Sequence, residues 1–356
     1  MNIITNKKTI LIAPLNWGLG HACRCIPIIN ALLEQQYKPI LATDGAALAL
    51  LKKEFPTLEI LELPSYQIEY SKKGENLKWQ LLKNSLKTVK AIQQEKKIIK
   101  NWIEKYNING IISDNRLGVF SNKVPSVYIT HQLNVLSGNT TWLTSKIHQN
   151  IIKKYTECWV PDSKNTPNLT GELGHLEKAN LNLKYIGPLS RLQKKEIDKK
   201  YDLMVLLSGP EPQRGILEEK LKIEILNFSG QTIFIKGVVE KNQIKEQVDN
   251  VTYYNFMSSI ELEQAFNESE MVLCRSGYTT VMDLVKLRKK AFFIPTPGQY
   301  EQEYLAEKYK AEGLAPYAIQ DDFTMENIKE IDNYRGLPQI DSEINWKCLF
   351  QVFETE

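Results

Sequence analysis

Short apolar runs alternate with longer amphipathic or polar segments along almost the whole chain. Runs of this kind are typical of parallel strands buried on both faces of a sheet, and the segments between them have the period of amphipathic helices. The pattern therefore predicts repeated βα units and an α/β fold. The predicted strands are residues 10–15, 39–43, 58–63, 110–113, 126–130, 158–160, 202–207, 232–236, 251–256, 271–273 and 291–295.

A charged stretch without clear periodicity, residues 191–200, interrupts this alternation after the turn Tyr185-Ile-Gly-Pro-Leu-Ser190. It is the best candidate for a linker, because the alternation restarts after it. The sequence thus predicts two tandem Rossmann-like domains with doubly wound parallel sheets, residues 1–187 and 188–356. We expect them to face each other across a cleft, where such folds bind ligands, with the last ~20 residues able to pack back on the N-terminal domain.

The composition argues against nucleic acid, membrane spans, disulfide bonds and a cysteine-bound metal. The chain has 356 residues and a formal net charge of +3, which gives no reason to expect nucleic acid as a partner. No apolar run approaches the ~20 residues of a membrane span, and the N-terminus lacks the apolar region of a signal peptide, so we expect a cytoplasmic protein. The five cysteines are too scattered for a disulfide framework, and Cys23-x-Cys25 has no matching pair elsewhere that would indicate a metal.

The segment Cys274-Arg-Ser-Gly-Tyr-Thr-Thr-Val-Met-Asp283 carries the most specific chemistry. It follows a predicted strand and opens a helix, so the turn at Ser276-Gly277 presents unpaired helical N–H groups that can bind an anion. Thr279 and Thr280 add hydroxyls, and Asp283 lies one turn further along the same face, where a carboxylate can accept hydrogen bonds from a diol. These residues predict a phosphate site beside a sugar-hydroxyl site. The alternative is an ordinary capped helix after a buried strand.

A second glycine-rich turn follows the first predicted strand. Gly18 and Gly20 allow close backbone approach of a ligand, and His21 stands at the start of the next helix. Cys23 occupies the third glycine position of a dinucleotide fingerprint, which weakens that interpretation. With an intrinsic pKa of about 6.5, His21 can serve as a general base; a hydrogen-bonding group at the helix N-terminus is the alternative. Asp114 ends another predicted strand and can orient His21, bind an acceptor or belong to a plain turn.

Two further loops follow strands of the second half. The first contains Ser208 and Gly209, which can hold a phosphate with charge from Arg214, or form a proline-rich turn with an exposed arginine. The loop at residues 295–303 offers side chains suited to sugar hydroxyls, or a solvated polar turn before a helix. Its polar candidates are Gln299, Glu301 and Gln302.

The order of these motifs resembles that of GT-B glycosyltransferases of family 28, the MurG-like type, over nearly the whole chain. In that family a glycine-rich N-terminal loop ending in Gly-His faces the acceptor, and the C-terminal half holds a UDP-sugar. The resemblance implies a turn near the base at Phe256 and Met257, and a ribose contact at Asp283. The matching positions are Gly18-Leu-Gly-His21, Ser208-Gly209, Phe256-Met257, Cys274, Arg275, Ser276, Gly277, Asp283 and Gln302.

The chain departs from the pattern of this family at two places. The family usually has Glu at the ribose, and Asp283 is one methylene shorter. The first phosphate loop reads Ser208-Gly-Pro-Glu-Pro-Gln-Arg214 rather than a glycine-serine-glutamine-glycine run. Because proline removes an amide donor, we expect Arg214 to supply the missing interaction. No acceptor-side segment identifies a substrate, so the acceptor stays open as a glycan, a lipid-linked compound or a small molecule.

These residues and the resemblance predict an enzyme that transfers a sugar from a nucleotide-sugar donor to a hydroxyl acceptor. The resemblance implies a UDP-linked donor, with UDP-N-acetylglucosamine as a candidate, and inversion at the anomeric carbon. Helix N-terminal amides, Thr279, Thr280 and Arg214 can neutralise the leaving phosphates, and the chain has no Asp-x-Asp sequence, so we expect neither a metal nor another cofactor. The alternatives are a nucleotide-sugar epimerase or hydrolase on the same fold, and a non-catalytic sugar-binding protein.

Residues 76–105 predict a long amphipathic helix with an apolar stripe and a lysine face. The lysines, with nearby Trp142 and Leu143, can draw this region to the inner face of the membrane as a peripheral contact. The alternative is that the stripe packs on a sheet and the lysines are simply solvated. The stripe is Leu77, Leu81, Leu82, Val89, Ile92, Ile99, Trp102 and Ile103, and the opposite face is Lys83, Lys87, Lys90, Lys97 and Lys105.

Overall fold

The computed structural model describes residues 7–66, 77–177, 180–340 and 343–354, with the side chains of residues 77–86 left out. Its first half forms a seven-stranded sheet in the order β3-β2-β1-β4-β5-β6-β7, in which every neighbouring pair is parallel. The strands are β1 Thr9–Pro14, β2 Lys38–Thr43, β3 Ile60–Glu62, β4 Ile108–Asp114, β5 Ser126–Ile129, β6 Glu157–Val160 and β7 Leu183–Tyr185. The helices are α1 Gly20–Glu34, α2 Gly45–Glu54, α3 Leu77–Lys105 and α4 Thr141–Ile152.

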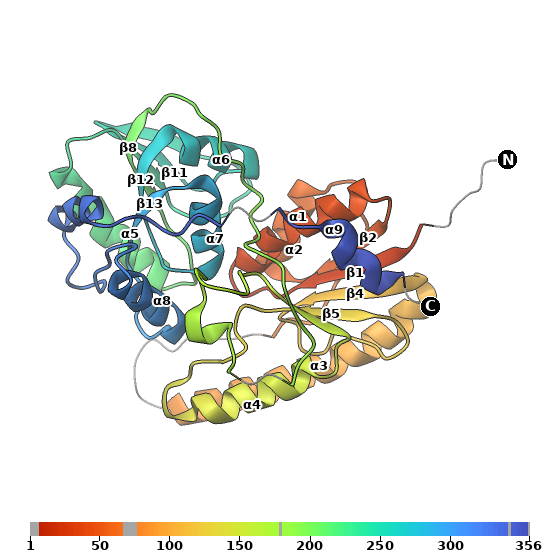
Figure 1. The fold of residues 1–356 in the computed structure, drawn as a ribbon. Helices are drawn as coiled ribbons and strands as arrows, with labels where there is room; N and C mark the ends of the chain where they lie inside the picture. Colours follow the sequence, from red (N-terminus) through yellow and green to blue (C-terminus); the bar gives the residue numbers. More distant parts are fainter. Residues whose placement is uncertain (1–6, 67–76, 178–179, 341–342, 355–356) are drawn as a thin grey trace.

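The second half forms a six-stranded sheet in the order β10-β11-β9-β8-β12-β13, parallel except for the β10–β11 pair. The strands are β8 Tyr201–Leu206, β9 Thr232–Ile235, β10 Lys245–Val248, β11 Val251–Tyr254, β12 Ser269–Cys274 and β13 Lys290–Phe293. The helices are α5 Gln213–Glu224, α6 Ser259–Glu268, α7 Tyr278–Leu287, α8 Tyr300–Ala311 and α9 Trp346–Phe350. Figure 1 shows the two sheets in separate lobes joined along α1 and α7.

Alternate residues of the central strands face helices on opposite sides, which is why these strands read as continuous apolar runs. In β1, Ile10 and Ile12 pack in the cluster that contains α1, whereas Leu11 and Ala13 pack in the cluster that contains Ile99 of α3. In the second sheet Met204 and Val205 divide in the same way between two clusters. The predicted α/β class with two doubly wound parallel sheets is therefore confirmed.

The prediction missed two edge strands. The β10 strand is Lys-Glu-Gln-Val with every residue exposed, so it has no apolar pattern to find, and it pairs antiparallel at the edge. The β7 strand is short and only half-buried. Residues 186–200, which include the predicted linker, contain neither helix nor strand, and the backbone N–H groups of Gln193 and Lys195 bond to side chains of α6.

The C-terminal segment returns to the first lobe (Figure 1). The ring of Phe350 in α9 lies 5.6 Å from Tyr37 and 6.3 Å from Trp159. A Cβ on Gly110 of β4 would come within 2.3 Å of the Phe353 ring, so the close packing of this segment on the sheet requires glycine there. This last stretch of chain thus completes the core of the first lobe.

The α3 stripe is only partly buried. Ile99 and Ile103 are buried against the first sheet, as the packing alternative predicted, whereas Val89 is 51% exposed. Lys90 and Lys97 are exposed. The side chains of Leu77, Leu81, Leu82 and Lys83 lie outside the described residues.

In each sheet the chain reverses its direction of strand addition next to the first strand of that half. The reversal lies between β1 and β4 in the first sheet and between β8 and β12 in the second. Ligands of open α/β sheets bind at the carboxyl ends of the strands beside such a reversal. These positions are occupied by the loops that the sequence singled out, those after β1, β4, β8 and β12.

Candidate active site

The two lobes meet at the N-termini of α1 and α7. Helix α1 begins at Gly20, two residues after Gly18 at φ +70°, and α7 begins at Tyr278 with Gly277 as its N-cap. A Cβ on Gly20 would lie 2.8 Å from the hydroxyl of Thr279, so only glycine allows this approach without displacing the threonine. The loop that carries His21, the predicted general base, and the turn at Gly277 that is predicted to bind phosphate are therefore neighbours across the lobe boundary.

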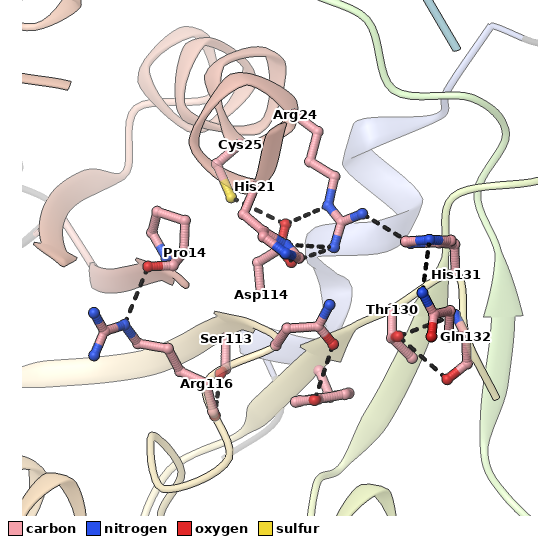
Figure 2. A network of polar contacts seen from close by, with 12 residues as sticks. Pro14, His21, Arg24, Cys25, Ser113, Asp114, Arg116, Thr130, His131 and Gln132 are labelled. Carbon is pink, nitrogen blue, oxygen red and sulfur yellow. Dashed lines mark hydrogen bonds and ion pairs between the residues drawn. The ribbon is translucent and has the colours of Figure 1, made fainter. Parts of the chain in front are cut away.

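His21 and Asp114 form a pair on the first-lobe side of this junction (Figure 2). Nδ1 of His21 lies 2.8 Å from Oδ1 of Asp114, the last residue of β4. Arg24, one turn further along α1, donates from Nε to Oδ2 of Asp114 at 2.5 Å and from Nη2 to Oδ1. Asp114 is fully buried, and the His21 side chain keeps 11% of its surface exposed. The buried side chains of Asp114 and Arg24 thus fix the orientation of the imidazole of His21, while part of its surface stays exposed at the junction.

The charges in this cluster favour a neutral imidazole beside an ionised carboxylate. Burial raises the pKa of Asp114, but the charges of Arg24 and His21 and their hydrogen bonds outweigh it and hold that pKa well below its usual range. Burial lowers the pKa of His21, with Arg24 acting in the same direction and Asp114 opposing. Nδ1 of His21 lies near both the Asp114 carboxylate and Nη2 of Arg24, which is 2.9 Å away. In the tautomer that donates from Nδ1 to Asp114, Nε2 carries a lone pair that can accept a proton from a hydroxyl.

Asp283 lies on α7, one turn from Thr279, and is 8% exposed. Ser190 donates a hydrogen bond of 2.6 Å to its Oδ1. Burial raises the pKa of Asp283 to about 6, and the Arg191 charge and the Ser190 hydrogen bond oppose that rise. A carboxylate that is costly to ionise in a closed site gains from new hydrogen-bond donors, such as the hydroxyls of a diol.

Arg191 is a site candidate that the sequence interpretation missed. It begins the charged stretch that the sequence predicts to be a linker, yet its Nε is buried and has no partner among the described residues. The charge of Arg191 interacts with Cys23, which belongs to the first lobe, and with Asp283, which belongs to the second lobe. The available signal was its position, three residues after Gly187-Pro188, which follow the last strand of the first sheet.

Three glycines at the carboxyl edge of the second sheet border open space. A Cβ on Gly209, Gly277 or Gly298 would meet no atom within 4 Å. They belong to the loops after β8, β12 and β13, so the backbone of all three loops is accessible to a ligand. Gly18 in the first lobe is open in the same way.

Several residues that the sequence predicts to bind the nucleotide-sugar donor hold these loops together by hydrogen bonds. Arg275 donates to the carbonyls of Ile294, Pro295 and Gln213 and to the side chain of Gln320. The hydroxyl of Ser276 donates to the carbonyl of Gln302, whose side chain in turn bonds Thr296 N and Gln299. Two buried atoms in these loops, Nε of Arg275 and Oγ1 of Thr296, have no partner within the described ranges.

Arg214, Phe256 and Met257 take other positions around the second lobe. Arg214 is bound by Glu211 and by Glu218, the latter at 2.6 Å, so it would have to exchange partners to reach a phosphate at Gly209. Phe256 lies under the ammonium of Lys53 from the first lobe, 4.6 Å from the ring centroid. Met257 is half-buried against the main apolar cluster. Ser208 and Thr280 are also half-buried.

Glu301 at the start of α8 contacts the first lobe. Its Oε1 lies 2.8 Å from Nε2 of His131, and its Oε2 accepts a hydrogen bond from Gln132. Burial opposes ionisation of Glu301, yet His131 beside it lowers its pKa overall. The residue predicted to bind sugar hydroxyls is therefore also a bridge between the lobes.

Two features of the described residues concern metals and membranes. Within the described ranges, no group of three or more His, Cys, Asp or Glu side chains is arranged to hold a metal ion. No helix in the same ranges is long and apolar enough to span a membrane.

A doubly wound parallel sheet on each side of a junction is the GT-B architecture, which this chain shares with solved glycosyltransferases. Residues 211–333 match the family described as "Glycosyltransferase family 28 C-terminal domain". The second half of the chain is thus similar to the family 28 glycosyltransferases, and the chain as a whole is similar to MurG in sequence and fold.

Two curated relatives share the name UDP-N-acetylglucosamine--N-acetylmuramyl-(pentapeptide) pyrophosphoryl-undecaprenol N-acetylglucosamine transferase. That of Haemophilus ducreyi is 24% identical over 260 residues, 70% of this chain and 70% of the relative. That of Buchnera aphidicola is 28% identical over 264 residues, 71% of this chain and 70% of the relative. Among solved structures, Acinetobacter baumannii MurG has a TM-score of 0.54 at 14% identity, covering 98% of this chain and 99% of its own. The calicheamicin glycosyltransferase CalG4 has a TM-score of 0.61 at 13% identity, covering 98% and 94%.

Proposed function

We propose that this enzyme transfers N-acetylglucosamine from UDP-N-acetylglucosamine to a hydroxyl of a lipid-linked acceptor, with inversion and without a metal. The names of the relatives supply the donor and the acceptor class. The observation that carries the proposal is the contact between Gly20 and Thr279, which sets the His21–Asp114 pair beside the N-terminus of α7. In this assignment residues 1–187 form the acceptor domain and residues 188–356 the donor domain.

The donor lies along the carboxyl edge of the second sheet. The diphosphate binds the N-terminal amides of α7 with the hydroxyls of Thr279 and Thr280, because a helix N-terminus favours negative charge. The ribose diol donates to Asp283, with Arg191 beside it. The base lies near Phe256 and Met257, and the sugar reaches Gln299, Glu301 and Gln302 at the lobe junction. The loop of Ser208 and Gly209 closes the site from the β8 side.

In the transfer step, Nε2 of His21 removes the proton from the acceptor hydroxyl, and the hydroxyl oxygen attacks the anomeric carbon on the face opposite UDP. Asp114 stabilises the imidazolium that forms, since it stays ionised next to Arg24. The negative charge that develops on the leaving diphosphate is stabilised by the α7 amides and hydroxyls. Proton removal and charge stabilisation thus come from opposite sides of the junction.

A donor screen tests this function. Thermal unfolding should shift upward with UDP-N-acetylglucosamine, because a ligand at about a hundred times its Kd adds about 2.7 kcal/mol of stability. GDP-, TDP- and CMP-sugars at equal concentration are the controls and should shift it less. No shift with any nucleotide sugar would contradict the proposal. Loss of UDP-sugar without an acceptor, followed by chromatography, would instead indicate a hydrolase or an epimerase.

A lipid-linked acceptor requires the enzyme to contact a membrane surface. Helix α4 has an exposed apolar face that can make this contact. Trp142, Leu143 and Ile147 are 72%, 50% and 53% exposed on this helix, and the ammonium of Lys146 lies 5.0 Å from the centroid of the Trp142 ring. Apolar side chains with a neighbouring cation suit the interface of an anionic bilayer. We assign this face as the peripheral membrane contact of the acceptor domain.

Vesicle co-sedimentation tests the membrane contact. Binding to anionic vesicles should occur at low salt and weaken at high salt, because electrostatic attraction is screened. The double variant Trp142→Ser/Ile147→Ser should sediment less. The matched control is Ile223→Ser, which alters an isoleucine that is 68% exposed in the other lobe and should sediment like wild type. Absence of wild-type binding at low salt would exclude the contact and favour a soluble acceptor.

A further inference from the structure

His131 lies where three elements meet and has no part in the proposed transfer step. It follows β5 by two residues and is 5% exposed. Its Nδ1 lies 3.0 Å from Nη1 of Arg24 on α1, and its Nε2 lies 2.8 Å from Oε1 of Glu301 on α8. Its ring is stacked on Tyr278 of α7, with centroids 4.3 Å apart and an angle of 10° between the planes. Figure 2 shows the imidazole extending the Asp114–Arg24 pair away from His21.

The hydrogen-bond roles of this histidine are fixed by its neighbours. An arginine has only donors, so Nδ1 of His131 must accept from Arg24. The proton of the neutral ring is then on Nε2 and is donated to Glu301. A continuous chain therefore runs from Glu301 in the donor lobe through His131 and Arg24 to Asp114, and from Asp114 to His21.

His131 also separates a buried cation, Arg24, from a half-buried anion, Glu301. Arg24 is 2% exposed, and the charges of Arg24 and Glu301 act on each other. Without the imidazole, Nη1 of Arg24 would lose its acceptor and Glu301 would lose a donor, which is costly in a buried site. Opposite charges attract, so without His131 the attraction of Arg24 to Glu301 would compete with the two hydrogen bonds that hold Arg24 on Asp114.

A displaced Arg24 would change the proton affinity of His21. Nη2 of Arg24 lies 2.9 Å from Nδ1 of His21, where its positive charge disfavours the imidazolium, whereas Asp114 favours it. Moving the cation away leaves Asp114 to act on His21 alone. The ionisable groups that face His21 or His131 from the surrounding elements are Arg24, Asp114, His148, Tyr278 and Glu301.

We propose that His131 is a positioning residue that holds Arg24 on Asp114, and so keeps His21 unprotonated, and that it ties this arrangement to Glu301 of the donor lobe. Its importance for turnover rests on the proposed function. Its effect on His21 does not, because it can be measured without any substrate.

The test is an NMR titration of the full chain labelled with ¹³C at the histidine Cε1 positions. The chain has four histidines, so His21 can be assigned by its absence in His21→Gln. His131→Phe keeps the ring that stacks on Tyr278 but has neither acceptor nor donor. In this variant the titration midpoint of His21 should move up by about one pH unit, a shift typical of a change in neighbouring charge. His131→Ala, which lacks the ring, should give the same upward shift and serves if the phenylalanine variant does not fold.

Two controls separate positioning from packing. His131→Gln keeps one acceptor and one donor, so its His21 midpoint should stay at the wild-type value. In His131→Phe/Glu301→Gln the charge that draws Arg24 is gone, so the midpoint should return to that of Glu301→Gln alone. An unchanged His21 midpoint in folded His131→Phe, or equal shifts in the Phe and Gln variants, would overturn the proposal. Failure of the proposed function would appear separately, as absence of sugar transfer by the wild type.

Discussion

His21→Ala should lower kcat by roughly 10²–10⁴ while leaving donor affinity nearly unchanged, because a positioned general base contributes about that much to a proton transfer. The imidazole lies on the acceptor side of the junction and contacts Asp114 and Arg24 rather than the donor loops. The acidic limb of the pH–rate profile should flatten as well, since no group with the pKa of His21 then needs to lose a proton. Steady-state kinetics with calorimetry of UDP binding measure both quantities.

Asp114→Asn is the companion to this variant. The amide keeps the shape of the side chain but lacks the negative charge that stabilises an imidazolium. The kcat of Asp114→Asn should fall to an extent similar to that of His21→Ala. The double variant should lose little more kcat than either single variant. Wild-type turnover in His21→Ala would make His21 a structural residue and remove the proposed mechanism.

Asp283→Ala should weaken UDP affinity by roughly ten- to a hundredfold, the effect of losing a charge-assisted hydrogen bond of about 1.5–3 kcal/mol. The pKa of Asp283 is raised to about 6 by burial, so the carboxylate that accepts from the ribose is lost as the pH falls below about 6. Wild-type affinity should therefore decrease over that range, and the affinity of Asp283→Asn should not. Calorimetry at pH 5 and pH 8 decides it, and equal UDP affinity of wild type and Asp283→Ala would contradict the ribose assignment.

The same carboxylate should reduce the stability of the nucleotide-free protein. A folded-state pKa above the unfolded value means that the folded chain holds the proton more tightly, so stability falls as the pH rises from about 4 through about 6. Two pKa units correspond to about 3 kcal/mol, so Asp283→Asn should unfold at higher denaturant concentration than wild type near pH 7. Weaker nucleotide binding in a more stable protein distinguishes a binding role from a structural one.

Apolar periodicity predicted the class of fold because central parallel strands must be buried on both faces. Ile10 and Ile12 face one helix layer and Leu11 and Ala13 the other, and this requirement is visible in the sequence. The same logic cannot find β10, whose residues are all exposed and whose pairing depends only on backbone hydrogen bonds. Edge strands of this kind are set by the strand beside them.

The candidate site was predictable where a local turn defines it and hidden where distant segments meet. The turns at Gly18 and Gly277 gave His21, Thr279 and Asp283 from sequence, since a strand followed by glycine and a helix start is a local pattern. Arg191 and His131 were not predicted as site residues because the residues they interact with are more than ninety positions away in the sequence. His131 and Glu301, for example, are separated by 170 residues. Arg214 was expected at a phosphate, but Glu211 and Glu218, three residues before it and four after it, compete for it, and this local spacing of opposite charges was overlooked.

The most direct test of the central claim is a transfer assay with the wild-type chain, UDP-N-acetylglucosamine labelled in the sugar, and a polyprenyl-diphosphate-linked acceptor in detergent or vesicles. The account predicts that label moves into the lipid fraction in an amount equal to the UDP released, and that His21→Ala abolishes most of this transfer while still binding UDP. Release of UDP without labelled lipid, or labelled lipid formed equally well by His21→Ala, would contradict it.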